Sequence, residues 1–152
     1  MKKLFTALLF SFFFSAGWAQ CVSTEQDKAG VTAACQDYIQ AFYKADTTIA
    51  YRSVHPLLQK RGFSYSAANQ AYSKQLEMPF PALVSLAKRW NADGKQANEN
   101  SVQKVQILDI CDKTASAKVT AVWGIDYIHL VKEQGKWWVM NVLWQSVPQQ
   151  KL

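Results

Sequence analysis

The chain has 152 residues, of which 49% are hydrophobic and 18% are charged, a composition typical of one globular domain and not of a disordered chain. Its formal net charge is +6, but the basic residues are scattered, and Lys60-Arg61 and Lys88-Arg89 are the adjacent pairs beyond the first twenty residues. Nucleic-acid-binding proteins gather their basic residues into a stripe or patch, so the sequence argues against a nucleic-acid partner.

Residues 1–19 have the pattern of a signal peptide, which leaves residues 20–152 as a single predicted domain. A basic start precedes an apolar run over residues 4–14, and Gly17 and Ala19 supply the small side chains that a signal peptidase requires. No later stretch approaches the roughly 20 apolar residues of a membrane-spanning helix. The sequence therefore predicts an exported protein, periplasmic or secreted, without a transmembrane segment.

Three cysteines follow the predicted cleavage site: Cys21, Cys35 and Cys111. An oxidising compartment permits one disulfide and leaves one thiol over. Cys35 with Cys111 would tie a helix to a strand, whereas Cys21 with Cys35 would hold the N-terminus, and the sequence does not choose between them. Lipid attachment at Cys21 is the less favoured alternative, because Trp18 and Gln20 fit a lipid-attachment motif poorly. No metal site is predicted, since no second ligand stands at metal-binding spacing beside any cysteine.

Residues 25–45 are predicted to form a first helix, because apolar residues recur there at helical spacing. Asp46 is a natural N-cap for a short second helix, which should end at His55 because a proline follows. A third helix is predicted to begin at Pro81 and to stop before Gly94. The linking segments differ: residues 63–66 are expected to form a short strand, and residues 67–80 a loop or irregular helix.

Beyond Val102 the apolar period changes from helical to two, which predicts strands. The expected segments in chain order are a strand from Val102, a turn near 112–113, a strand over 117–131 that bends at Gly124, a turn over 133–136 and a strand over 137–144. Helices followed by a meander of strands predict an α+β fold, with the helices packed on a bent antiparallel sheet.

Two blocks of residues carry a family resemblance. They are Asp37-Tyr38-Ile39, Tyr43, Asp46, His55-Pro56-Leu57-Leu58 and Lys60-Arg61-Gly62 in the first block, and residues 115–119, 126–132, 135–137 and 141–144 in the second. Over residues 28–145 the chain resembles the bacterial family called "putative lumazine-binding", of the nuclear-transport-factor-2-like superfamily. The resemblance implies a cone whose bent sheet encloses a pocket. It does not imply one function, because the superfamily includes isomerases, dehydratases, carriers and adaptors.

The last predicted hairpin defines a pocket-facing surface. A two- or four-residue loop places Leu130 opposite Val139 and Ile128 opposite Asn141, and cross-strand partners share a face. This face would be apolar apart from Asp126 and Asn141, and a small-molecule pocket needs such a surface. The candidates for the pocket are Tyr38, Phe42, His55, Asp126, Ile128 and Asn141.

The other face of the same hairpin is rich in large side chains. Three large aromatic residues together exceed the apolar patch that a monomer leaves exposed, so a second subunit is expected to cover them as a homodimer. The interface candidates are Tyr127, His129, Trp138, Met140 and Trp144.

These observations predict an exported protein that binds an unidentified small molecule, aromatic and heterocyclic compounds being the candidates, in a mostly apolar pocket without a cofactor. One alternative is a cofactor-independent isomerase or dehydratase with Asp126 or His55 as base. Another is a non-catalytic protein-interaction module. No catalytic residue is assigned. Lys60 and Arg61 are expected to be a solvated loop pair, with an anion-binding role as the alternative.

Overall fold

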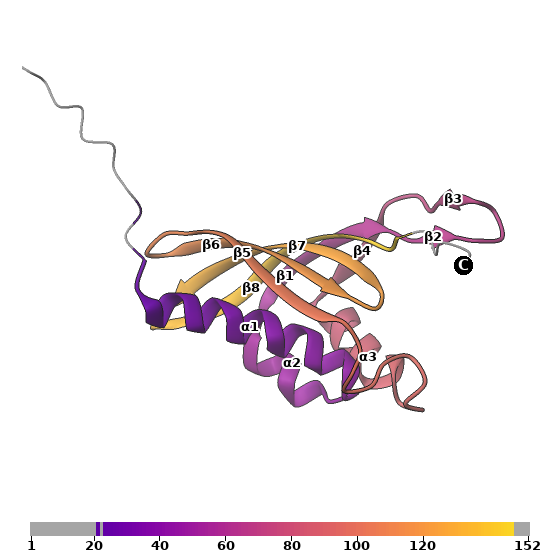
Figure 1. Cartoon of the computed structure of the whole chain (residues 1–152), viewed down its shortest axis with the longest axis horizontal. Coiled ribbons are helices and arrows are strands. Elements are labelled where there is room, and N and C mark those ends of the chain that lie inside the picture. The colour runs from indigo at the N-terminus through magenta and orange to yellow at the C-terminus, as the bar shows by residue number, and fades with distance from the viewer. Residues whose placement is uncertain (1–20, 22, 148–152) are drawn as a thin grey trace, which may run out of the picture.

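The structure is a computed structural model that describes Cys21 and residues 23–147 (Figure 1). The predicted signal peptide, residues 1–19, lies outside the described residues. In the part of the chain that is described, no helix has the length and apolar character to cross a membrane.

The helices lie on one side of the sheet and are α1 (Glu25–Tyr43), α2 (Thr47–Ser53) and α3 (Phe80–Trp90) (Figure 1). α1 begins where Thr24 and Asp27 form a reciprocal capping box. α2 begins after Asp46, whose carboxylate accepts a hydrogen bond of 2.8 Å from the Thr48 backbone N–H. Pro81 lies in the first turn of α3, where its missing N–H costs nothing. The three predicted helices are confirmed.

The main sheet has the strand order β4-β1-β8-β7-β6-β5. Its strands are β1 (Val54–Phe63), β4 (Leu76–Pro79), β5 (Gln103–Ile110), β6 (Thr114–Ala121), β7 (Gly124–Glu133) and β8 (Lys136–Gln145). A small second sheet pairs β2 (Tyr65–Ser66) with β3 (Ala71–Tyr72), and it projects from one end of the molecule (Figure 1). The α+β class is confirmed. The sheet is mixed and not wholly antiparallel, because β1 runs parallel to β8.

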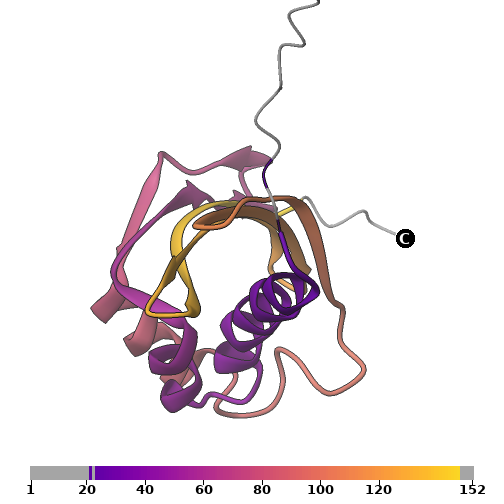
Figure 2. The ribbon, with the colours of Figure 1, turned by 90° about the vertical axis from the view of Figure 1, so that its left-hand side faces the viewer.

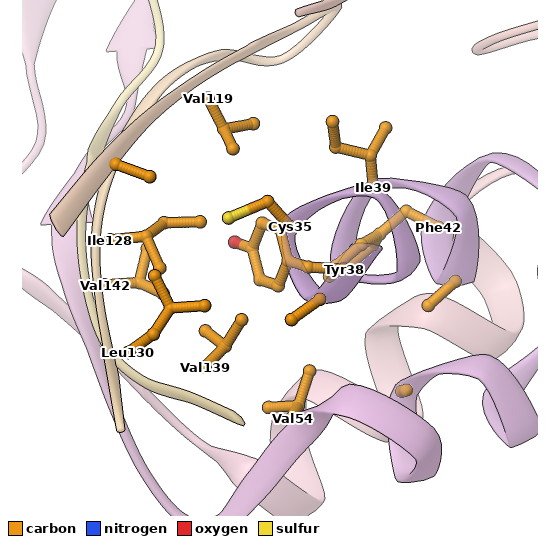
Figure 3. Packing of buried hydrophobic residues seen from close by; sticks show 14 of the residues in the cluster. Cys35, Tyr38, Ile39, Phe42, Val54, Val119, Ile128, Leu130, Val139 and Val142 are labelled. Carbon is orange, nitrogen blue, oxygen red and sulfur yellow. The ribbon is translucent and has the colours of Figure 1, made fainter. Parts of the chain in front are cut away.

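The sheet curls around α1, so that its concave face encloses the helix (Figure 2). Cys35 and Tyr38 of α1 point toward Ile128 and Leu130 of β7, and all four side chains are at most 1% exposed (Figure 3). Burying each aliphatic side chain of this kind contributes at most about 1.5–3 kcal/mol. The core therefore lies between one helix and the concave face.

Residues 54–63 form a full strand, where the sequence analysis expected the end of the second helix at His55. Pro56 is tolerated because the pairing of β1 with β8 is irregular between Val54 and Gln59, so no ladder hydrogen bond is lost there. In the second half of β1, Leu58, Lys60 and Gly62 are buried and alternate with exposed neighbours. Lys60 is consequently not a solvated loop residue. Likewise, β4 replaces part of the loop expected over residues 67–80.

The single bent strand expected over residues 117–131 is two strands. Val122 and Trp123 form a tight turn, and β6 pairs antiparallel with β7 from Ala121 and Gly124 onward. Gly124 has a φ of +137°, and a Cβ there would lie 2.2 Å from the Gln145 carbonyl oxygen. Glycine is therefore required at this position both by the positive φ and by the close approach of β8.

The predicted register of the last hairpin is right near the loop and wrong further along. Leu130 pairs with Val139 as expected, but His129 pairs with Asn141 because Met140 is an extra, bulged residue. The bulge reverses the face of every residue beyond it. Ile128 is therefore opposite Val142, and Asn141 lies on the convex face, where it is exposed.

The disulfide joins Cys21 to Cys111, a pairing that the sequence analysis did not weigh. Cys35 keeps its thiol because it is fully buried on the inner side of α1, and burial raises its pKa to about 12. Cys111 directly follows β5, so the disulfide ties the segment before α1 to the end of an edge strand.

Candidate functional site

Four side chains from separate elements meet in a buried polar cluster on the concave side of the sheet, which we call the Lys60–Asp126 cluster: Tyr38 of α1, Lys60 of β1, Trp123 of the β6–β7 turn and Asp126 of β7. Tyr38 donates a hydrogen bond of 3.1 Å to Asp126 Oδ1 and accepts one from Lys60 Nζ. Lys60 Nζ also lies 3.3 Å from the same oxygen. Trp123 Nε1 donates to Asp126 Oδ2 at 2.6 Å. Asp126 is 0% exposed and Lys60 is 5% exposed, so this ion pair is withdrawn from water.

Local structure accounts for each position. Tyr38 lies on the face of α1 that the sheet covers. Lys60 points inward because it occupies an inward position of the alternating strand β1. Trp123 is in the turn just before Asp126, so a three-residue separation brings the indole back onto the carboxylate.

Burial dominates the electrostatics of the cluster. Removal from water lowers the pKa of Lys60, and the negative charge and hydrogen bond of Asp126 act in the opposite direction. Burial also raises the pKa of Tyr38 well above its usual value, and the charge of Asp126 adds to this effect. Tyr38 is therefore a neutral phenol that can both donate and accept. A buried ion pair needs such extra hydrogen bonds, because its charges lose their hydration.

A cavity of about 210 Å³ adjoins Lys60 between the C-terminal part of α1, helix α3 and the concave face. Its lining residues are Phe42, Lys60, Ser64, Met78, Leu86, Trp90, Trp123, Trp144 and Ser146. The Lys60 ammonium lies 5.3 Å from the ring centre of Trp144 and 5.8 Å from that of Phe42, within range of cation–π attraction. The indole N–H of Trp144 is buried and has no hydrogen-bond partner among the described residues. The cavity therefore has aromatic walls and a cationic group at one end.

Three of the predicted pocket residues come together at this place: Tyr38 and Asp126 in the cluster, and Phe42 in the cavity wall. Ile128 is 1% exposed and belongs to the core behind the cluster. His55 is elsewhere, with Nε2 at 3.4 Å from the Glu133 carboxylate and its ring edge-on to Trp138. Asn141 is on the opposite face of the sheet, for the reason given above.

The sequence analysis missed Lys60 and Trp123 as members of the cluster. The signal for Lys60 was present in the alternation of Leu58, Lys60 and Gly62, which Pro56 obscured. Trp123 had no such signal, because its role depends on a turn that was taken for a continuous strand.

Four of the five interface candidates lie on the convex face: Tyr127, His129, Trp138 and Met140. Trp144 was placed there wrongly, since the bulge at Met140 turns it onto the concave face, opposite Asp126. The convex face also has a groove of about 330 Å³, whose lining combines polar residues such as Asp109 and His129 with apolar ones such as Val131 and Met140. Because Asn141 and not Trp144 lies on the convex face, this face is less apolar than the predicted register implied.

Solved structures with this fold are NTF2-like proteins. An NTF2-like protein of unknown function from Methylobacillus flagellatus superposes with a TM-score of 0.60 at 20% identity, over 83% of this chain and 96% of its own. One from Shewanella baltica gives a TM-score of 0.59 at 20% identity, over 84% and 99%. A ketosteroid isomerase-like protein from Erwinia carotovora atroseptica gives 0.54 at 12% identity, over 82% and 99%. At these identities the likeness concerns the fold.

The fold is thus NTF2-like, as the resemblance implied. Within that class the chain belongs to the family described as "Putative lumazine-binding", which matches residues 26–145. No curated protein matches the sequence of this chain.

Proposed function

We propose that this protein is an exported, non-catalytic binding protein that holds a small planar heterocyclic or aromatic molecule in the cavity next to Lys60. The observation that carries the proposal is the buried Lys60–Asp126 pair at the end of an aromatic-walled cavity. The family description, which names lumazine, is in keeping with a heterocyclic ligand.

The size and walls of the cavity limit the ligand. A volume of about 210 Å³ is smaller than the roughly 300 Å³ at which pockets for drug-sized molecules begin, so one or two fused rings fit best. Trp90 and Trp123 stand nearly perpendicular to one another, with an angle of 87° between the rings. Such walls offer a ring face and a ring edge to a flat ligand.

The polar groups limit the ligand further. An ammonium group has three N–H donors, and the described residues offer Lys60 two acceptors, the oxygens of Tyr38 and Asp126. The third donor of Lys60 and the indole N–H of Trp144 both suit an acceptor atom on the ligand. A carbonyl oxygen on a heterocycle has this character.

The cluster favours binding over acid–base catalysis. Both carboxylate oxygens of Asp126 already accept hydrogen bonds, and Lys60 lies between the carboxylate and the cavity. His55 and His129 are not near Asp126. The isomerase or dehydratase alternative therefore lacks a free base next to a proton donor among the described residues.

A thermal-shift titration with lumazine and with smaller carbonyl-bearing heterocycles tests the proposal, because a ligand stabilises the state that it binds. We expect a concentration-dependent rise in Tm. Trp144→Phe keeps the aromatic wall and removes one donor, so it should weaken binding about three- to tenfold. Tyr127→Phe, on the convex face, is the matched control and should bind as the wild type does. Equal weakening by both variants, or no rise in Tm with any of these compounds, would refute the proposal.

Export and dimerisation are further parts of the proposal. The disulfide between Cys21 and Cys111 suits an oxidising compartment, and it uses the sulfur atom that a lipid anchor would need. An intact mass of the protein purified from the producing bacterium should correspond to a chain that begins at Gln20 and carries no lipid.

For the dimer, we expect sedimentation at micromolar concentration to show a dimer in the wild type and a monomer when Tyr127 and Trp138 on the convex face are replaced by Glu. A wild-type monomer would rule out the dimer.

A further inference from the structure

We propose that Lys60 binds small planar aldehydes or ketones covalently, as a reversible imine formed at the end of the aromatic cavity. The inference rests on the proposed function, since it concerns the same cavity, and it names carbonyl compounds as the ligand class.

The position of Lys60 sets it apart from an ordinary lysine. Its side chain is 5% exposed, whereas Lys88 is exposed. It reaches the cavity between the rings of Trp144 and Phe42, so a flat carbonyl compound stacked on either ring has its reactive carbon near the nitrogen. Proximity of this kind converts an encounter in solution into a local reaction.

The neighbours of Lys60 supply the proton transfers. Loss of a proton from the ammonium to Asp126, directly or through the Tyr38 hydroxyl, leaves a free amine. The amine lone pair attacks the carbonyl carbon, the C=O π bond opens, and its oxygen takes back that proton to give a carbinolamine. A second proton from nitrogen follows the same route to the hydroxyl, the C–O bond breaks, and water leaves as the nitrogen forms the C=N bond.

Nitrogen keeps its third proton, so these steps give the iminium directly. An ammonium and a carbonyl have become an iminium and a water molecule, and the charge opposite Asp126 is the same before and after. The carboxylate that stabilises the ammonium therefore stabilises the iminium as well. The lowered pKa of Lys60 increases the fraction of amine available for attack.

Reductive trapping with benzaldehyde and cyanoborohydride tests the inference on the folded mature chain. The reductant converts an imine into a stable benzylamine, and peptide mapping by mass spectrometry locates it. We expect Lys60 to be labelled at least about tenfold faster than Lys88, because the cavity holds the aldehyde beside the Lys60 nitrogen. Burial also lowers the pKa of Lys60, which acts in the same direction. Lys60→Arg keeps the positive charge beside Asp126 but cannot form an imine, so the fast labelling at position 60 should disappear. Lys88→Met should be labelled at Lys60 as fast as the wild type.

Labelling that is confined to exposed lysines, or that is as fast in Lys60→Arg as in the wild type, would overturn the inference. The outcome is separable from that of the proposed function. A heterocycle that raises Tm without any adduct on Lys60 supports non-covalent binding alone, whereas rapid benzylation of Lys60 without a thermal shift from any heterocycle supports the imine alone.

Discussion

Two aspartates of this molecule, Asp27 and Asp126, have matching sets of partners and opposite surroundings. Asp27 accepts hydrogen bonds from Lys132 at 2.5 Å and from the Trp137 indole at 3.1 Å. Asp126 accepts from Lys60 and from the Trp123 indole. Asp27 lies in the first turn of α1. Asp126 belongs to β7 and contacts Tyr38, which lies about three turns after Asp27 along α1.

The lysines distinguish the two clusters. The Lys132 side chain is 28% exposed and that of Lys60 is 5% exposed. Asp27 is also held by the Thr24 capping box, and the hydrogen bond from Lys132, followed by those from Thr24, lowers its pKa. In the Lys60–Asp126 cluster the stronger effect is the desolvation of the lysine. The same residue types thus have two different roles. Where water reaches the lysine, Asp27, Lys132 and Trp137 hold the start of α1 against the sheet, and we call this cluster the helix clamp. Where water does not reach the lysine, Lys60 is a candidate reactive group.

The largest effect is expected from Asp126→Leu, which leaves the Lys60 charge buried without a partner. Such a loss costs about 3–5 kcal/mol of unfolding free energy. Urea denaturation of the variant and the wild type measures it. Removing both charges, in the double variant Asp126→Leu with Lys60→Met, should restore most of the lost unfolding free energy, because no unpaired charge then remains.

Asp109→Leu on the exposed part of β5 is the matched control and should change stability by no more than about 0.5 kcal/mol. If Asp126→Leu were as mild as this control, Lys60 would not be held as an ion pair, and the contrast between the two clusters would be lost.

A smaller effect is expected at the helix clamp from Gly30→Ala. A Cβ at this position would lie 2.6 Å from Trp137 Cδ1, so the indole must move away from Asp27. Overpacking of this kind costs about 1–3 kcal/mol, although alanine is favoured over glycine in a helix by about 1 kcal/mol. We expect a net loss of stability in urea denaturation. Ala33→Gly, at an exposed position of the same helix, should lose only about 0.5–1 kcal/mol, and a Gly30→Ala variant more stable than the wild type would contradict the close packing.

The two clusters also differ in how far the sequence reveals them. The helices were predictable because their signals are local: Asp46 caps α2, and Pro81 opens α3. Asp126 was predictable as a buried polar residue, since the alternation of β7 places it among apolar neighbours. These features depend on residues only a few positions apart.

The partner of Asp126 was not predictable in the same way. Lys60 faces inward because β1 pairs in parallel with β8, which follows about eighty residues later, and its pairing is irregular near Pro56. The bulge at Met140 has no marker residue, and it exchanged the faces of Asn141 and Trp144. Tertiary pairing therefore decides the composition of the candidate site, and local patterns decide the elements that carry it.

The smallest effect is expected from Asp27→Asn, and it should depend on pH. Because the pKa of Asp27 is lower in the folded protein than in the unfolded chain, its carboxylate stabilises the fold above the unfolded pKa. This contribution decreases as pH falls through the acidic range toward the folded pKa. The Tm of Asp27→Asn should accordingly lie below that of the wild type at neutral pH, and the gap should narrow in acid. Asp93→Asn, on the exposed loop after α3, is the control and should show little difference in Tm at either pH. A gap for Asp27→Asn that stays constant from neutral to strongly acidic pH would mean that the charge of Asp27 contributes nothing, and that its cluster differs from that of Asp126 in geometry alone.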